Sequence, residues 1–181
     1  HPPFESATWE GDDSYDPEGK TIVAYDWSLI SQPDGSAISM PLGDGPNRDP
    51  FIPDLAGEYV GRLIVTTTDG RTSEPCDVTL ESIPAEDLWI EMYWSHNDDD
   101  MDLHLIRGSG TRETNQDCYY ANCVGGLSWG PAGISDDPRL DLDDIPGIGP
   151  ENINIDSPES TIYAVMVHDY PYTGTFSGGN D

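Results

Sequence analysis

Oxygen-bearing side chains gather in two segments of the second half of the chain, and their chemistry is that of a binding site for a hard cation. Calcium takes about six to eight oxygen ligands from carboxylates, amide carbonyls, backbone and water. Two acidic loops that face one another would supply such ligands, so the two segments together predict a calcium site. The candidate ligands are Asn97, Asp98, Asp100 and Asp102 in the first segment and Asp141, Asp143, Asp144, Glu151 and Asn152 in the second.

Neither segment is an EF-hand. In the loop that begins at Asp98, the position that requires glycine is Leu103 and no glutamate stands at the twelfth place, and the loop after Asp141 fails in the same way. The alternative is an acidic surface in contact with water, which is the better explanation for any single aspartate here. For the two segments together we expect calcium, bound with a dissociation constant of about 10⁻⁴–10⁻³ M, the range of extracellular modules.

The chain as a whole is strongly acidic. Its 181 residues include 35 Asp and Glu against 7 Lys and Arg, a formal net charge of −28. A field of this sign repels nucleic acids and anionic membrane surfaces, so neither is an expected partner, and no apolar stretch is long enough to insert into a membrane. Clustered carboxylates repel one another unless cations neutralise them, although solubility or adaptation to high salt is an alternative explanation of the charge.

Cysteines and loop aromatics are further candidates for chemistry. Cys118 and Cys123 are close enough in the sequence to close a small disulfide loop in an oxidising compartment, with a reduced pair as the alternative. Cys76 has no obvious partner, and three cysteines without a histidine at ligand spacing do not predict zinc. Rings in loops often stack on sugars or contact proteins, with core filling as the alternative. The candidate rings are Tyr119, Tyr120, Trp129, Tyr170 and Tyr172.

Catalytic patterns are weak. Residues 126–130 match Gly-x-Ser-x-Gly, but that motif requires a preceding strand and a following helix, whereas glycine, proline and loop flank it here. His104 and His168 each lie in a strand-like stretch, and no nucleophile or other partner can be assigned to them, so they are expected to be structural or exposed. The sequence therefore predicts a protein that is not an enzyme.

The elements that must position these residues are strands, because the hydrophobic period is two almost everywhere. Residues 21–30, 58–68, 88–94 and 101–105 each show a period of two, with one face mainly apolar and polar residues concentrated on the other. Residues 163–167 are apolar on both faces, which predicts a central buried strand. Clusters of Gly, Pro and Asp separate these stretches, and the whole pattern is typical of antiparallel sandwiches.

The first module, residues 1–84, ends at Pro84, which fits the end of the strand predicted at Cys76–Ser82 because proline cannot donate to a ladder, and it contains a recognisable set of motifs. They are Asp12-Asp13-Ser14-Tyr15-Asp16-Pro17-Glu18-Gly19, Tyr25-Asp26-Trp27, Gly57-Glu58-Tyr59 and Val65-Thr66-Thr67-Thr68-Asp69-Gly70. In order and spacing they resemble a PKD (polycystic kidney disease) domain over about residues 5–82. The resemblance implies an immunoglobulin-like sandwich, in which Trp27 fills the core and Tyr59 pins a corner. It also implies a weaker calcium site formed by Asp13, Asp16, Asp26 and Asp69.

The second module, residues 85–181, contains Asp100-Met101-Asp102-Leu103-His104-Leu105, the stretches 141–144 and 149–153, and Thr161-Ile162-Tyr163-Ala164-Val165. These residues resemble β-sandwich modules of bacterial surface lipoproteins and, more distantly, pre-peptidase C-terminal domains. The resemblance implies that the acidic residue opening the Asp-Leu-His-Leu strand approaches the later Asp-rich loop, with calcium between them.

Together these observations predict an all-β chain of two tandem antiparallel sandwiches, the first immunoglobulin-like and the second jelly-roll-like. The expected function is that of a calcium-stabilised structural or adhesive protein, secreted or at the cell surface, whose partner is a surface protein or a polysaccharide. One alternative is a subunit of an extracellular filament that pairs with copies of itself by strand exchange, because each end is expected to lack a strand. Another is an accessory region that guides a secreted hydrolase to its polymer.

Overall fold

The computed structural model describes residues 1–125, 127–130, 133–145 and 147–170, and the chain divides into two compact units between Pro84 and Ala85. Every strand pairing in both units is antiparallel, so the predicted all-β sandwich class is confirmed. Among the described residues, no helix is long and apolar enough to cross a membrane.

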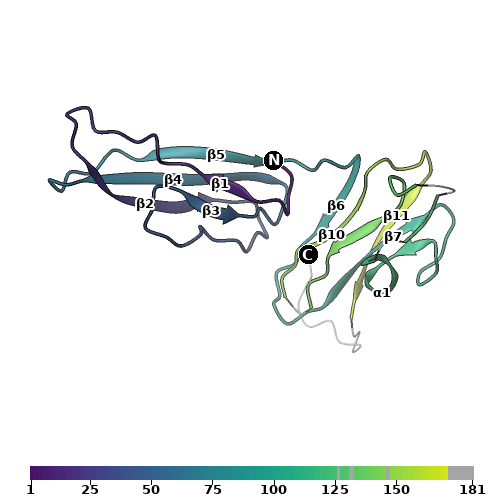
Figure 1. Cartoon of the computed structure of the whole chain (residues 1–181). Coiled ribbons are helices and arrows are strands. Elements are labelled where there is room, and N and C mark those ends of the chain that lie inside the picture. Colours follow the sequence, from purple (N-terminus) through teal and green to yellow (C-terminus); the bar gives the residue numbers. More distant parts are fainter. Residues whose placement is uncertain (126, 131–132, 146, 171–181) are drawn as a thin grey trace. The chain divides into compact units, whose positions relative to one another are not determined.

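The first unit is built from two sheets (Figure 1). In the smaller sheet β1 (Ala7–Trp9) pairs with β3 (Arg48–Phe51), and in the larger one β4 (Gly57–Thr67) lies between β2 (Ile22–Ser31) and β5 (Cys76–Ser82). Trp9, Phe51 and Tyr59 form the buried core between the sheets, with Trp27 and Leu29 packed against them. The alternation read from the sequence therefore places Trp27 and Leu29 of β2 and Tyr59 of β4 against the core, whereas Val23, near the start of β2, is 58% exposed.

Tyr59 pins the start of β4 to the preceding loop, as the sequence predicts. Its ring is fully buried and packs edge-on against Phe51, with ring centroids 5.5 Å apart. Its hydroxyl donates a hydrogen bond to Asp54 (2.8 Å) and accepts one from the backbone N–H of Leu55 (3.0 Å). One residue thus supplies both apolar burial and a polar anchor for the corner.

The described part of the second unit also forms two sheets, each of three strands. Figure 1 labels β6 and β10 of one sheet and β7 and β11 of the other. One has the order β6-β10-β9 and the other the order β11-β7-β8, and a single helical turn, α1, follows β8. The bounds are β6 (Leu88–Met92), β7 (Met101–Arg107), β8 (Asp117–Cys118), α1 (Tyr120–Cys123), β9 (Arg139–Leu142), β10 (Glu151–Ile155) and β11 (Tyr163–Asp169).

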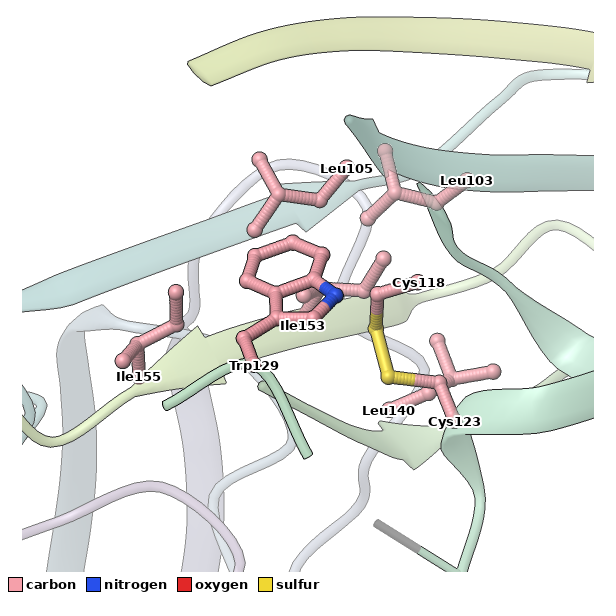
Figure 2. Close-up of a cluster of buried hydrophobic side chains, with 8 residues drawn as sticks. All are labelled: Leu103, Leu105, Cys118, Cys123, Trp129, Leu140, Ile153 and Ile155. Atoms are coloured by element: carbon pink, nitrogen blue, oxygen red, sulfur yellow. A yellow bond between two sulfur atoms is a disulfide. The ribbon is translucent and has the colours of Figure 1, made fainter. Parts of the chain in front are cut away.

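A disulfide and a tryptophan lie in the core of the second unit. Figure 2 shows the Trp129 indole and the Cys118–Cys123 bond between the strand that carries Leu103 and Leu105 and the strands that carry Ile153, Ile155 and Leu140. The two cysteine Cα atoms are 5.1 Å apart, so the predicted disulfide is confirmed, and both cysteines are fully buried. Cys76, in the first unit, is free and exposed.

The prediction of a central strand at residues 163–167 is wrong. Within the described part of the chain, β11 lies at an edge of its sheet, beside β7 only. Val165 and Val167 are 54% and 48% exposed. A run that is apolar on both faces fits a buried strand, but the pattern does not record how many neighbours a strand has, and single exposed valines are tolerated on a surface.

Candidate metal centre

Strand β7 turns two polar side chains to one face and two leucines to the other. Leu103 and Leu105 point into the hydrophobic core, so the alternation of the strand places Asp102 and His104 on the opposite face. A polar face is ordinarily in water, yet Asp102 is only 4% exposed and His104 only 1%. Both side chains must find partners inside the protein, because a buried charge without a partner is costly.

Three carboxylates from different parts of the second unit meet at this point. One oxygen from each of Asp102, Asp143 and Glu151 lies within 4.8 Å of the others. Glu151 opens β10 and is 1% exposed, and its Oε2 accepts a hydrogen bond from the Leu103 N–H at 2.7 Å. Its Oε1, like the buried Oδ1 of Asp143, has no hydrogen-bond partner among the described atoms. When all three groups are ionised, two buried acceptor oxygens of this cluster are therefore left without a donor.

The environment of the cluster opposes ionisation. Burial raises the pKa of Glu151 to about 8, with the charges of Asp143 and Asp102 adding to the effect and the Leu103 N–H opposing it. Burial is also the main cause that raises the pKa values of Asp143, Asp102 and Asp100. Near neutral pH, Glu151 is therefore mainly protonated unless a positive charge lies beside it, and the protonated carboxyl can donate a hydrogen bond to Asp143. A divalent cation would supply that charge and allow all three groups to ionise.

The two acidic loops are held against each other by backbone contacts. The Trp94 N–H donates to the carbonyl of Ile148 at 2.9 Å, and Asp99 forms an isolated antiparallel bridge with Gly147. Asp144 closes its own loop by accepting a hydrogen bond from the Gly149 N–H at 2.9 Å. After burial, the negative charge of Asp144 is among the causes that raise the pKa of Asp100. The buried Oδ1 of Asp100 has no hydrogen-bond partner among the described atoms. Asp100 and Asp144 thus border the cluster without belonging to its closest group.

The other predicted ligands lie elsewhere. Asn97 and Asp98 are exposed. Asp141 and Asn152 alternate with inward-facing residues of β9 and β10, so they occupy the face opposite to Glu151. There the Asn154 side-chain amide donates to Asp141 Oδ2 at 2.7 Å and to Asn152 Oδ1 at 2.9 Å. These oxygens serve a hydrogen-bond network on the face opposite to Glu151, where Asn152 and Asn154 are fully buried.

The four acids singled out in the first unit do not form a group. Asp13 and Asp26 are exposed, whereas Asp16 and Asp69 both contact the guanidinium of Arg71, at 3.5 and 3.1 Å. Asp16 Oδ1 also accepts the N–H of Glu18 at 2.8 Å. In this unit, all of whose residues are described, no three metal-ligating carboxylate, histidine or cysteine groups meet.

The predicted contact rings divide into two sets. Trp129 is a core residue, 7% exposed, and its indole N–H donates to the carbonyl of Asn115 at 3.0 Å. Tyr119, Tyr120 and Tyr170 instead lie in contact with one another near the histidines: the ring centroids are 5.4 Å apart for Tyr119 and Tyr120 and 6.1 Å apart for Tyr120 and Tyr170. Tyr172 lies outside the described residues.

Sequence reasoning missed the involvement of both strand histidines. In the antiparallel register of β7 and β11, His168 stands directly opposite Asp102, and its Nδ1 lies 3.3 Å from Asp102 Oδ2. His104 is buried, with its Nδ1 2.8 Å from Oδ2 of the fully buried Asp117. Asp102, His104 and His168 each offer a ligand atom within 4.8 Å of the others. The available signal was Asp-x-His on one strand, which places both side chains on one face.

No model of a known protein family matches the chain, and no curated protein or solved structure matches it either.

Proposed function

We propose that this chain is a calcium-binding structural or adhesive protein, not an enzyme, and that it acts outside the cell or on the cell surface. In this proposal the ion stabilises the second unit, and that unit contacts a surface protein or polysaccharide. The first unit is a PKD-like spacer. The observation that carries it is the convergence of Asp102, Asp143 and Glu151, whose buried carboxylate oxygens include two that receive no hydrogen bond when the groups are ionised.

The donor set of this cluster suits calcium. Its ligand atoms are carboxylate oxygens, which hard cations prefer. Asp100, immediately before β7, can supply a further carboxylate. Calcium accepts irregular geometry and about six to eight ligands, whereas magnesium demands a near-octahedral arrangement and retains most of its waters. Backbone carbonyls of the two abutting loops and water would complete the shell of a calcium ion.

The stabilising effect follows from linkage. An ion that binds the folded state alone, present at 100 times its dissociation constant, adds ~2.7 kcal/mol to the free energy of unfolding. This is a substantial part of the total stability of a small module. The confirmed disulfide agrees with an oxidising compartment, where free calcium reaches the concentrations that such a site needs.

The test combines calorimetric calcium titration with thermal melting of the purified protein. We expect one calcium ion per chain at the cluster, and Glu151→Gln and Asp143→Asn should each weaken binding by at least about tenfold because each removes a charged ligand. Asp98→Asn is the matched control, since it removes one exposed carboxylate from the neighbouring loop and should leave calcium affinity unchanged.

A second signature separates an ion site from a merely structural carboxylate. In chelator, Glu151→Gln should melt higher than the unmodified protein at neutral pH, because the neutral amide keeps an acceptor for the Leu103 N–H and removes a buried acid. In excess calcium the order should reverse. Equal calcium affinity in the wild type, Glu151→Gln and Asp143→Asn would exclude the proposed function.

A further inference from the structure

We propose that Asp102, His104 and His168 form a second metal site, specific for a transition-metal ion of the zinc class. It shares Asp102 with the carboxylate cluster but draws its other ligands from imidazole nitrogens, and it goes beyond the proposed calcium function. The three ligand atoms lie within 4.8 Å of one another. This spacing is compatible with a common ion after small adjustments of the side chains, because ligands about 2 Å from a zinc ion lie about 3–4 Å apart.

Strand geometry brings the three side chains together. Asp102 and His104 are two residues apart on β7 and share one face. His168 of β11 pairs with Asp102 across the ladder, so it reaches the same face from the neighbouring strand. The ligands are therefore carried by paired strands of one sheet, which hold a constellation of side chains more rigidly than loops do.

The hydrogen bond of His104 leaves its other nitrogen available to an ion. A carboxylate can only accept, so the 2.8 Å contact to Asp117 makes Nδ1 the donor, and in the neutral imidazole that an ion requires Nε2 is then the lone-pair atom. Asp117 is held in turn by the Glu113 N–H, which donates to the same Oδ2 at 2.8 Å. The His104 Nε2 is buried and has no hydrogen-bond partner among the atoms that the structure describes. A carboxylate behind a histidine whose far nitrogen is free is the usual support of a metal-bound imidazole.

Aromatic rings keep the two histidines in place. The His104 ring is stacked on Tyr119, with centroids 5.1 Å apart and planes 9° from parallel. Further ring contacts join Tyr119 to Tyr120, Tyr120 to Tyr170 and Tyr170 to His168. The ring centroids of His168 and His104 are 6.1 Å apart, so these five rings form a closed ring of contacts. Tyr120 and Tyr170 are 38% and 47% exposed, so the arrangement reaches the surface, where an ion can enter.

The ligand chemistry separates this site from the calcium cluster. Imidazole nitrogens favour zinc and its neighbours in the transition series, whereas calcium and magnesium favour oxygen. Two neutral histidines with one carboxylate also leave a coordination position for water or for a group from a partner. The structural alternative is an Asp102–His168 ion pair beside a buried His104–Asp117 pair, with no affinity for metal.

The test is a titration of the untagged, chelator-treated protein with Co²⁺, read by its visible absorption, followed by displacement with Zn²⁺. We expect one Co²⁺ per chain with the bands of nitrogen ligation. His168→Gln should lower the affinity for Zn²⁺ by about 10–100-fold or more, since even lost supporting contacts have effects of that size. His96→Gln is the matched control because its side chain is 62% exposed and lies outside the cluster, so it should bind like the wild type.

Orthogonal variants keep this inference separate from the proposed function. His168→Gln should lose zinc but keep calcium, whereas Glu151→Gln should lose calcium but keep zinc. Zinc affinity that is unchanged in His168→Gln, or that falls in Glu151→Gln and His96→Gln instead, overturns the inference and leaves the calcium proposal intact. If none of the variants loses calcium binding while the zinc affinities change as expected, only the calcium proposal is overturned.

Discussion

In Glu151 and in His104, the two polar atoms of the side chain have different surroundings. In each, one polar atom makes a short hydrogen bond, to the Leu103 N–H or to Asp117, and the other is buried without a partner among the described atoms. The bonded atom fixes the orientation of the side chain, and the unbonded one is available to a cation. The sequence shows that an acid and a histidine lie in strands. It does not show which polar atom of each side chain is hydrogen-bonded, because that depends on the packing.

Tyr59 supports a prediction at the same scale, on pH. Burial is the main cause that raises its pKa to about 12. The ordinary tyrosine pKa is about 10, so between about pH 10 and 12 the unfolded chain loses this proton while the folded chain retains it. The free energy of unfolding of the first unit should therefore be unaffected by Tyr59 below about pH 10 and fall as pH rises to about 12.

The comparison that isolates this effect is Tyr59→Phe, followed by denaturant unfolding from pH 7 to 12. At neutral pH the variant should be less stable by about 1–2 kcal/mol, since it loses the hydrogen bonds to Asp54 and Leu55. At alkaline pH its stability should decline less steeply than that of the wild type. Parallel pH curves for the two proteins would show that ionisation of Tyr59 does not contribute.

At the scale of elements, the period of two predicts the strands and most of their inward faces, and it also bears on which candidate ligands share a face. Ile153 and Ile155 face the core, so Glu151 faces inward and Asn152 outward by the same alternation, and Leu140 turns Asp141 outward. The sequence thus contained the means to separate the ligands of β9 and β10. It did not contain the burial of Asp102 and His104, which depends on the pairing of β7 with β11 and on the loop that carries Tyr119.

Strand β4 supports a prediction about close packing. A Cβ atom on Gly61 would lie 2.8 Å from the Trp9 ring, a rigid group in the core of the first unit. Gly61→Ala should therefore reduce the free energy of unfolding by about 1–3 kcal/mol, the usual range for overpacking. Gly45→Ala is the control, because no atom lies within 4 Å of its added Cβ. Equal melting temperatures for the two variants would contradict the packing described for Trp9.

In the whole molecule, the acidic residues that give the net charge of −28 have more than one role. Some acids act as acceptors that shape loops: Asp54 binds the hydroxyls of Ser36 and Tyr59, and Asp137 binds the Trp129 N–H. Others, such as Asp77, pair with the few arginines. What remains distinctive is the cluster around Asp102, where carboxylates are close together and buried. Composition predicts an affinity for cations, whereas the position of the candidate site follows from the fold.

The most direct measurement is an anomalous-scattering map of a crystal of the full chain grown with calcium and without chelator. We predict a calcium peak coordinated by oxygens of Asp102, Asp143 and Glu151, and the loss of that peak in the Glu151→Gln variant. A map with no ion among these three carboxylates, or with calcium only beside the exposed Asn97 and Asp98, would contradict it.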